Sequence, residues 1–67
     1  MSRRQELRDA LMIAKANYHS ARERLAASQR WNALTGKGYG SVVRDTAIER
    51  SSYSAWLKAS NAFVNYR

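Results

Sequence analysis

The chain has no cysteine and no proline, and only three of its 67 residues are glycine. Without cysteine it can form neither a disulfide nor a thiolate metal site, and one histidine with five acidic residues makes a dedicated metal cage improbable. A folded chain of this length buries only about 60% of the surface that its unfolded form exposes, which leaves it marginally stable alone. We therefore expect no metal or cofactor, and we expect self-association to supply additional stability.

Long apolar runs are absent as well. No stretch of about 18 apolar residues is present that could span a bilayer. The charged residues Arg3, Arg4 and Glu6 follow Met1 without an apolar segment behind them, so no signal peptide is expected. These features predict a protein without a membrane partner, located in the cytoplasm or packaged in a virion.

Acidic residues are scarce relative to basic ones, with 5 of the former against 12 of the latter and a formal net charge of +7. Such a charge favours association with nucleic acid or with acidic proteins. Most of the candidate contacts form a stripe along one flank of the first predicted helix, although interleaved acidic residues make an ordinary solvated face the alternative interpretation. The candidates are Arg4, Arg8, Lys15, Arg22 and Lys37.

The first half of the sequence predicts one long helix, from about residue 3 to residue 34. Ser2, followed three residues later by Gln5, forms a capping box at its start. Apolar and small residues then recur at alternating spacings of four and three, which places them on one face toward a partner helix. This predicted seam consists of Leu7, Leu11, Ala14, Tyr18, Ala21, Leu25 and Ser28.

All three glycines lie in residues 35–41, which predicts a hinge between two helices. Gly36 is well suited to the left-handed position that ends a helix. A second helix is expected to begin between Val42 and Ala47 and to end near residue 66. Its predicted inner seam consists of Ile48, Ser52, Ala55, Ala59, Ala62 and Tyr66.

The whole chain, residues 1–67, therefore reads as a single all-α domain, an antiparallel helical hairpin that dimerises into a four-helix bundle. An alternative is an α+β fold in which a helix, a β-hairpin and a second helix follow one another. Tyr39, Val42, Val43 and Ile48 would be its strand residues, although Asp45 followed by Thr46 makes a poor two-residue turn.

Apolar residues cover about half the circumference of the second predicted helix, which is more than one facing helix can bury. Aromatic and large aliphatic side chains of this kind dominate protein interfaces. We therefore expect a contact surface for a larger protein partner, either a host protein or a virion component. Its predicted residues are Trp31, Tyr39, Tyr53, Trp56, Leu57, Phe63 and Val64.

No constellation typical of catalysis is present. Gly36, Lys37 and Gly38 precede a helix, but they lack the glycine spacing and the preceding strand of a nucleotide-binding loop. His19 has a single acidic residue, Glu23, at helical spacing. We therefore predict a non-enzymatic interaction protein of the kind that phages and mobile elements encode, with a nucleic-acid-binding accessory role as the alternative.

Residues Leu34-Thr35-Gly36-Lys37 and Ser41-Val42-Val43-Arg44-Asp45, with a helical stretch after them, carry a further signal. This segment resembles the W family of phage head-to-tail joining proteins, which are small and basic. The resemblance implies a helix, a short β-hairpin and a second helix. It also implies a virion component that acts through protein contacts at the portal and tail, with basic residues near packaged DNA.

Overall fold

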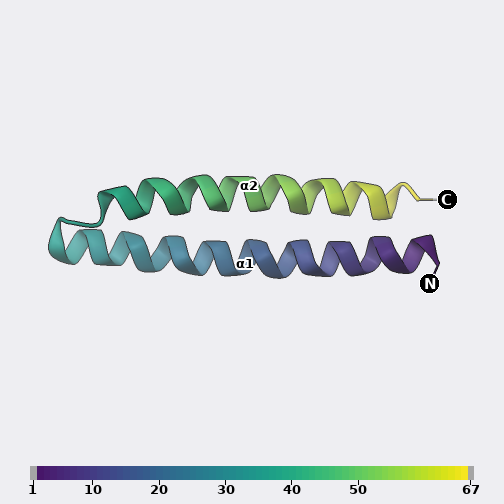
Figure 1. The fold of residues 1–67 in the computed structure, drawn as a ribbon, viewed down its shortest axis with the longest axis horizontal. Helices are drawn as coiled ribbons and strands as arrows, with labels where there is room; N and C mark the ends of the chain where they lie inside the picture. Colours follow the sequence, from purple (N-terminus) through teal and green to yellow (C-terminus); the bar gives the residue numbers. More distant parts are fainter. Residues whose placement is uncertain (1, 67) are drawn as a thin grey trace.

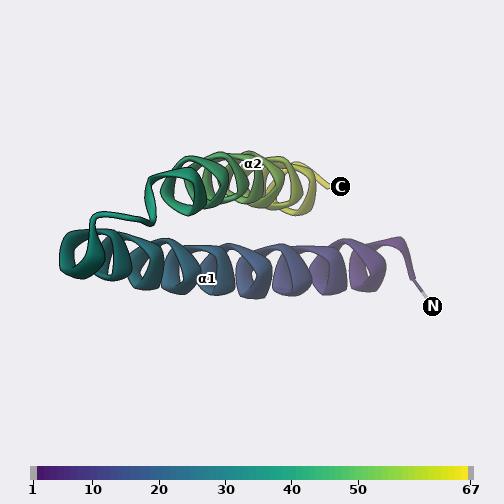
Figure 2. The same cartoon turned by 60° about the vertical axis from the view of Figure 1, so that its left-hand side comes forward.

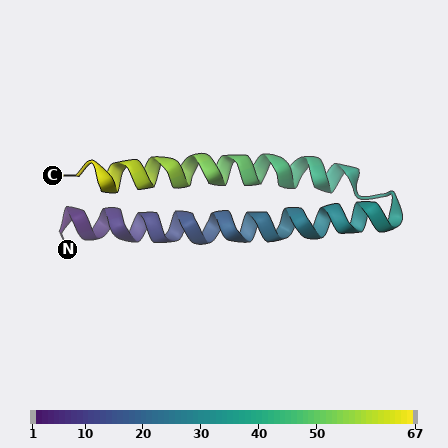
Figure 3. The same cartoon turned by 180° about the vertical axis from the view of Figure 1, so that it is seen from behind.

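The computed structural model describes residues 2–66 as two helices joined by a short turn. The first helix, α1, spans Arg3–Thr35, and the second, α2, spans Tyr39–Val64. They run antiparallel along their length, so that both chain ends lie at the same end of the molecule (Figure 1; Figure 3). Turning the molecule shows that the two axes are slightly inclined to one another (Figure 2). The predicted all-α hairpin is confirmed.

The α+β alternative is wrong for this chain, because helix α2 occupies the residues that would form its strands. Within residues 2–66 no strand is present. The β-hairpin that the phage-protein resemblance implies is therefore not found either. A β-branched pair such as Val42 and Val43 favours strands only weakly, and the tertiary contacts of α2 override that preference.

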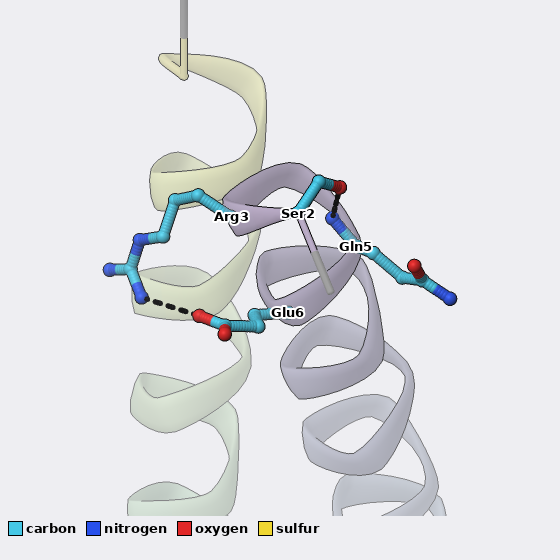
Figure 4. A network of polar contacts seen from close by, with 4 residues as sticks. All are labelled: Ser2, Arg3, Gln5 and Glu6. Carbon is cyan, nitrogen blue, oxygen red and sulfur yellow. Dashed lines mark hydrogen bonds and ion pairs between the residues drawn. The ribbon is translucent and has the colours of Figure 1, made fainter.

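The start of α1 shows one of the two hydrogen bonds of the predicted capping box. The side-chain oxygen of Ser2 accepts a hydrogen bond from the backbone N–H of Gln5 at 3.2 Å (Figure 4). Arg3 pairs with Glu6 one turn later, with 3.4 Å between Nη1 and Oε2. The Ser2 cap fixes where the helix begins, whereas the solvent-exposed ion pair adds little to the stability of the hairpin.

The turn between the helices is short and held by local hydrogen bonds. Gly36 has a positive φ of 69°, and its N–H donates to the carbonyl of Asn32 at 2.8 Å, which ends α1. The hydroxyl of Thr35 accepts from the N–H of Lys37 at 3.1 Å. The N–H of Gly38 donates to the side-chain Oδ1 of Asn32, also at 3.1 Å. The last turn of α1 therefore fixes the path of the chain into α2.

Helix α2 begins at Tyr39, earlier than the predicted start between Val42 and Ala47. Neither Asp45 nor Thr46 caps a later start, because Asp45 is buried between the helices and the hydroxyl of Thr46 donates to the Val42 carbonyl at 2.7 Å. The N–H of Val42 also donates to the carbonyl of Gly38 at 3.0 Å. The helix thus starts as soon as the chain leaves the turn.

The inner seam of α1 is the predicted one. Every one of its seven members is at least half-buried, whereas most of the surrounding positions are exposed. Ala21, at the middle, is only 4% exposed and is the one buried hydrophobic residue in the part of the chain that the structure describes. The heptad spacing was therefore a sufficient signal for this helix.

The inner seam of α2 differs from the prediction. Ser52 and Ala59 lie inside as expected, but Ile48, Ala55, Ala62 and Tyr66 are exposed. The helix is rotated so that larger residues face α1, and the observed seam consists of Val42, Asp45, Glu49, Ser52, Trp56, Ala59 and Phe63.

The physical reason for the rotation is the size of the side chains. Trp56 and Phe63 remove more apolar surface from water than Ala55 and Ala62 would in the same places. Trp56 also stacks on Tyr18 of α1, with ring centroids 5.2 Å apart and planes inclined by 27°. This contact between distant parts of the chain selects one of two seams that the spacing alone leaves equivalent.

The close approach at Gly38 yields a test of the turn. A Cβ on Gly38 would lie 2.9 Å from Cδ1 of Trp31 and 3.2 Å from the backbone nitrogen of Asn32, whereas a Cβ on Gly40 would meet nothing within 4 Å. We expect Gly38→Ala to destabilise the fold by about 1–3 kcal/mol through overpacking. Gly40→Ala, the matched control, should stabilise α2 by about 0.5–1 kcal/mol. Urea unfolding followed by circular dichroism measures both, and equal stabilities would contradict this account of the turn.

Candidate interaction surfaces

Each helix covers the other on one side only. Two long exposed faces therefore flank the seam, one on each side of it. We call the first the basic face; it carries Arg8, Lys15 and Arg22 from α1 and Tyr53, Leu57 and Val64 from α2. We call the second the groove face; it carries Ala10, Ile13 and Arg24 from α1 and Ile48, Ser51 and Ala55 from α2.

An aromatic cluster at mid-length borders the basic face. Tyr18 lies against Trp56 in the seam and against Tyr53, whose ring centroid is 5.4 Å away. His19 lies 6.0 Å from Tyr18 and 6.4 Å from Trp56 by the same measure. The guanidinium carbon of Arg22 stands 5.9 Å from the centre of the Tyr18 ring, within cation–π range. The cluster joins the helices and carries a cation at its rim.

The basic candidates of α1 lie together on this face. Arg8, Lys15 and Arg22 are seven residues apart and exposed, so they form a row with about 10.5 Å between successive positions. Arg4 and Arg8 line one hollow beside Phe63 at the open end of the hairpin. Lys37 lies in the turn between α1 and α2 and is not part of this row.

The predicted protein-contact residues divide into two groups. Tyr53, Leu57 and Val64 project from α2 on the basic face, with 43%, 45% and 74% of their surface exposed, and Tyr39 and Trp31 are exposed near the turn. Trp56 and Phe63, by contrast, are half-buried in the inner seam. We expected these two on the outside, and the structure places them where they hold the hairpin together.

The groove face was not anticipated from the sequence. One hollow is lined by Ala10, Ile13, Asn17, Ser51 and Ala55, among others. It adjoins a second hollow through Asn17 and Ser52, which in turn adjoins a third through Arg24 and Ile48. Ala55 and Ile48, which were predicted in the inner seam of α2, instead line this shallow groove. The spacing of these residues is visible in the sequence, but whether they face α1 or the solvent depends on how α2 is rotated.

A buried polar contact lies near the turn end of the seam. Asp45 is 6% exposed and accepts a hydrogen bond from the hydroxyl of Ser28 across the helix pair. Its other carboxyl oxygen lies 3.7 Å from Nε of Arg44. Because a misaligned helix pair would leave this buried carboxyl group without its hydrogen-bond donor on α1, the contact favours one longitudinal register of α2 on α1.

Neither a metal centre nor a membrane-spanning element is found in the described part of the chain. Residues 2–66 bring together no group of three or more histidine or acidic side chains that could hold a metal ion. Neither α1 nor α2 is both long and apolar enough to cross a membrane. Comparison with models of protein families, with curated proteins and with solved structures gives no match. Function must therefore be inferred from the two faces themselves.

The contact between Ser28 and Asp45 yields a second test. We expect Ser28→Ala to cost about 1–3 kcal/mol of stability, because it leaves the buried carboxyl group without its hydrogen-bond donor. Ser54→Ala is the matched control, since Ser54 is exposed on α2 outside both faces, and it should change stability by less than about 0.5 kcal/mol. Urea unfolding at one fixed protein concentration compares them. Identical midpoints for the two variants would rule out a role for this contact in stability.

Proposed function

We propose that the protein is a non-enzymatic helical interaction module that pairs with a second copy of itself and binds a larger protein partner. The observation that carries the proposal is the amount of apolar surface that the hairpin leaves uncovered. The candidate partners are a host protein or a virion component, in keeping with a chain of the kind that phages and mobile elements encode.

The hairpin buries too little to resemble a self-sufficient domain. Among residues 2–66 no large side chain is fully buried, and Ala21 is the single buried hydrophobic residue. The chain exposes 5362 Å², whereas a compact monomer of its length would expose about 4300 Å². The excess is similar to the roughly 800 Å² that each partner buries in a standard protein interface. Covering it with another helical surface would supply the missing core.

The groove face is suited to a second copy. Ile13 on α1 and Ile48 on α2 stand on opposite walls of the groove, with 63% and 38% of their surface exposed. The hollow near Ala10 and Ala55 contains no charged side chain among its lining residues. Two hairpins that pack these faces together would form a four-helix bundle with twofold symmetry.

The basic face stays free in such a bundle and would contact the larger partner. Its aliphatic and aromatic residues, Tyr53, Leu57 and Val64, come from the predicted contact set. Near the turn, Tyr39 adds aromatic surface at 71% exposure. Trp31, which is 59% exposed, follows Ala10 and Arg24 at multiples of seven residues and so lies toward the groove side. Large side chains that are exposed in one copy and lie on a continuous face are typical of protein contact sites.

A nucleic-acid-binding role is a second candidate, favoured by the row of Arg8, Lys15 and Arg22. Cations at regular spacing can follow a line of phosphates, and the exposed ring of Tyr53 beside them can stack on a base. Lys37 would act separately at the turn. Head-to-tail joining remains a prediction from the resemblance alone; co-purification with a capsid or portal would test it.

Self-association is tested by placing a charge in the groove. We expect the wild-type hairpin to be a dimer at micromolar concentration, and Ile13→Glu to weaken dimerisation at least about tenfold, because it would bury an unpaired carboxylate. Ala16→Glu is the matched control, since Ala16 is exposed on the outer side of the same helix. Size-exclusion chromatography with light scattering measures the masses. A monomeric wild type, or equal weakening by both variants, would show that the groove is not the contact.

The nucleic-acid candidate is tested by salt. If the row contacts phosphates, affinity for a fluorescent oligonucleotide should fall linearly with salt on a logarithmic scale, with a slope set by the number of phosphates contacted. Replacing Lys15 by glutamine should reduce that slope by roughly one. Lys58→Gln, on an exposed position of α2, is the control. No binding at low salt, or a flat salt response, would exclude this role.

A further inference from the structure

We propose that the larger partner presents an acidic amphipathic helix, which docks along the basic face as a third helix between α1 and α2. The inference rests on the proposed function and specifies the chemistry of its partner. It follows from two neighbouring rows of side chains. One helix carries an aliphatic row, and the other carries a row of cations with no acidic residue among them.

The aliphatic row belongs to α2. Val43, Leu57 and Val64 recur at multiples of seven residues, with Arg50 at the position between Val43 and Leu57. They therefore lie in line along one side of the helix, with Tyr39 and Tyr53 beside them. All five are exposed, and the row extends for about 30 Å at 1.5 Å per residue. This length corresponds to about 20 residues of a partner helix.

The row of cations belongs to α1 and runs alongside the aliphatic row. Arg8 lines a hollow with Phe63, and Arg22 lies over Tyr18, which itself contacts Tyr53. Lys15 stands midway between the two arginines. The row therefore follows the aliphatic residues of α2 from the open end of the hairpin to its middle.

Acidic residues are excluded from this face. Glu6 pairs with Arg3 away from it, and Asp45 and Glu49 belong to the inner seam. Asp9 and Glu23 share the heptad position opposite the seam, on the outer side of α1. In the part of the chain that the structure describes, the basic face therefore has cations that form no ion pair within the hairpin. An acidic ligand would form ion pairs with them.

The combination of rows favours a protein helix over a nucleic acid. A helix with apolar residues on one side and acidic residues at the edge of that side would cover Leu57 and Val64 and would pair with Arg8 and Lys15 at the same time. A nucleic acid would satisfy the cations and leave the aliphatic row in water. Because the groove face lies on the other side of the seam, the docked helix and a second copy can bind together.

The proposal is tested with synthetic helical peptides of about three heptads and the full-length protein. One peptide has leucine along one face and glutamate at the flanking positions, and two counterparts carry glutamine or lysine in place of glutamate. We expect the glutamate peptide to bind most tightly by fluorescence anisotropy, at least about tenfold better than the glutamine peptide. The lysine peptide should not bind.

Matched variants locate the site. Arg8→Glu with Lys15→Glu should abolish binding of the glutamate peptide and create binding of the lysine peptide. Arg30→Glu with Lys58→Glu makes the same change of charge at exposed positions away from the face and should alter neither. Leu57→Ser should weaken binding at least about tenfold, whereas Leu34→Ser, exposed at the turn, should not. An unchanged circular dichroism spectrum verifies that each variant folds.

Each contrary result has a distinct meaning. Equal binding of the glutamate and glutamine peptides would overturn the acidic partner while leaving the basic face as an interaction site. An oligonucleotide that displaces the peptide and binds Leu57→Ser as well as wild type would overturn the helix in favour of nucleic acid. A hairpin that is monomeric and binds no peptide of any charge would overturn the proposed function itself.

Discussion

The narrow contact between two helices is the constraint on which the rest of this structure depends. A hairpin can bury only one stripe of each helix, and here that stripe is made mostly of small or polar residues with a few large ones. Hydrophobic burial in one copy is correspondingly small, since stabilisation scales with the apolar area removed from water. The exposed large side chains are apolar groups that a single copy cannot bury in a core.

The stacking of Trp56 on Tyr18 decides how this constraint is met. By turning the large residues of α2 inward, it also determines what remains outside. Ile48 and Ala55 move to one side of the seam, where they line the groove, and Leu57 and Val64 move to the other, where they join the cations of α1. One aromatic contact thus separates the groove face from the basic face, and the contact between Ser28 and Asp45 aligns the helices along their length.

Much of the fold is readable from the sequence because its signals are local. The Ser2 cap, the heptad seam of α1 and the left-handed Gly36 each depend on residues within a turn or two. The rotation of α2 has no local signal. The row that contains Ala55 and the row that contains Trp56 both fit the spacing, and only the contact with Tyr18 distinguishes them. For the same reason the row of Arg8, Lys15 and Arg22 was visible in advance, whereas the groove was missed and Trp56 and Phe63 were expected on the outside.

The position of both chain ends at one end of the hairpin makes the molecule a rod with two unlike poles. The open pole carries Arg4 and Arg8 beside Phe63, and the turn pole exposes Trp31, Leu34 and Tyr39 together with Lys37. The relative direction of two copies then has a geometric consequence. A parallel pair would bring both turn ends to one extremity of the bundle and both open ends to the other, whereas an antiparallel pair would place one turn end and one open end at each extremity.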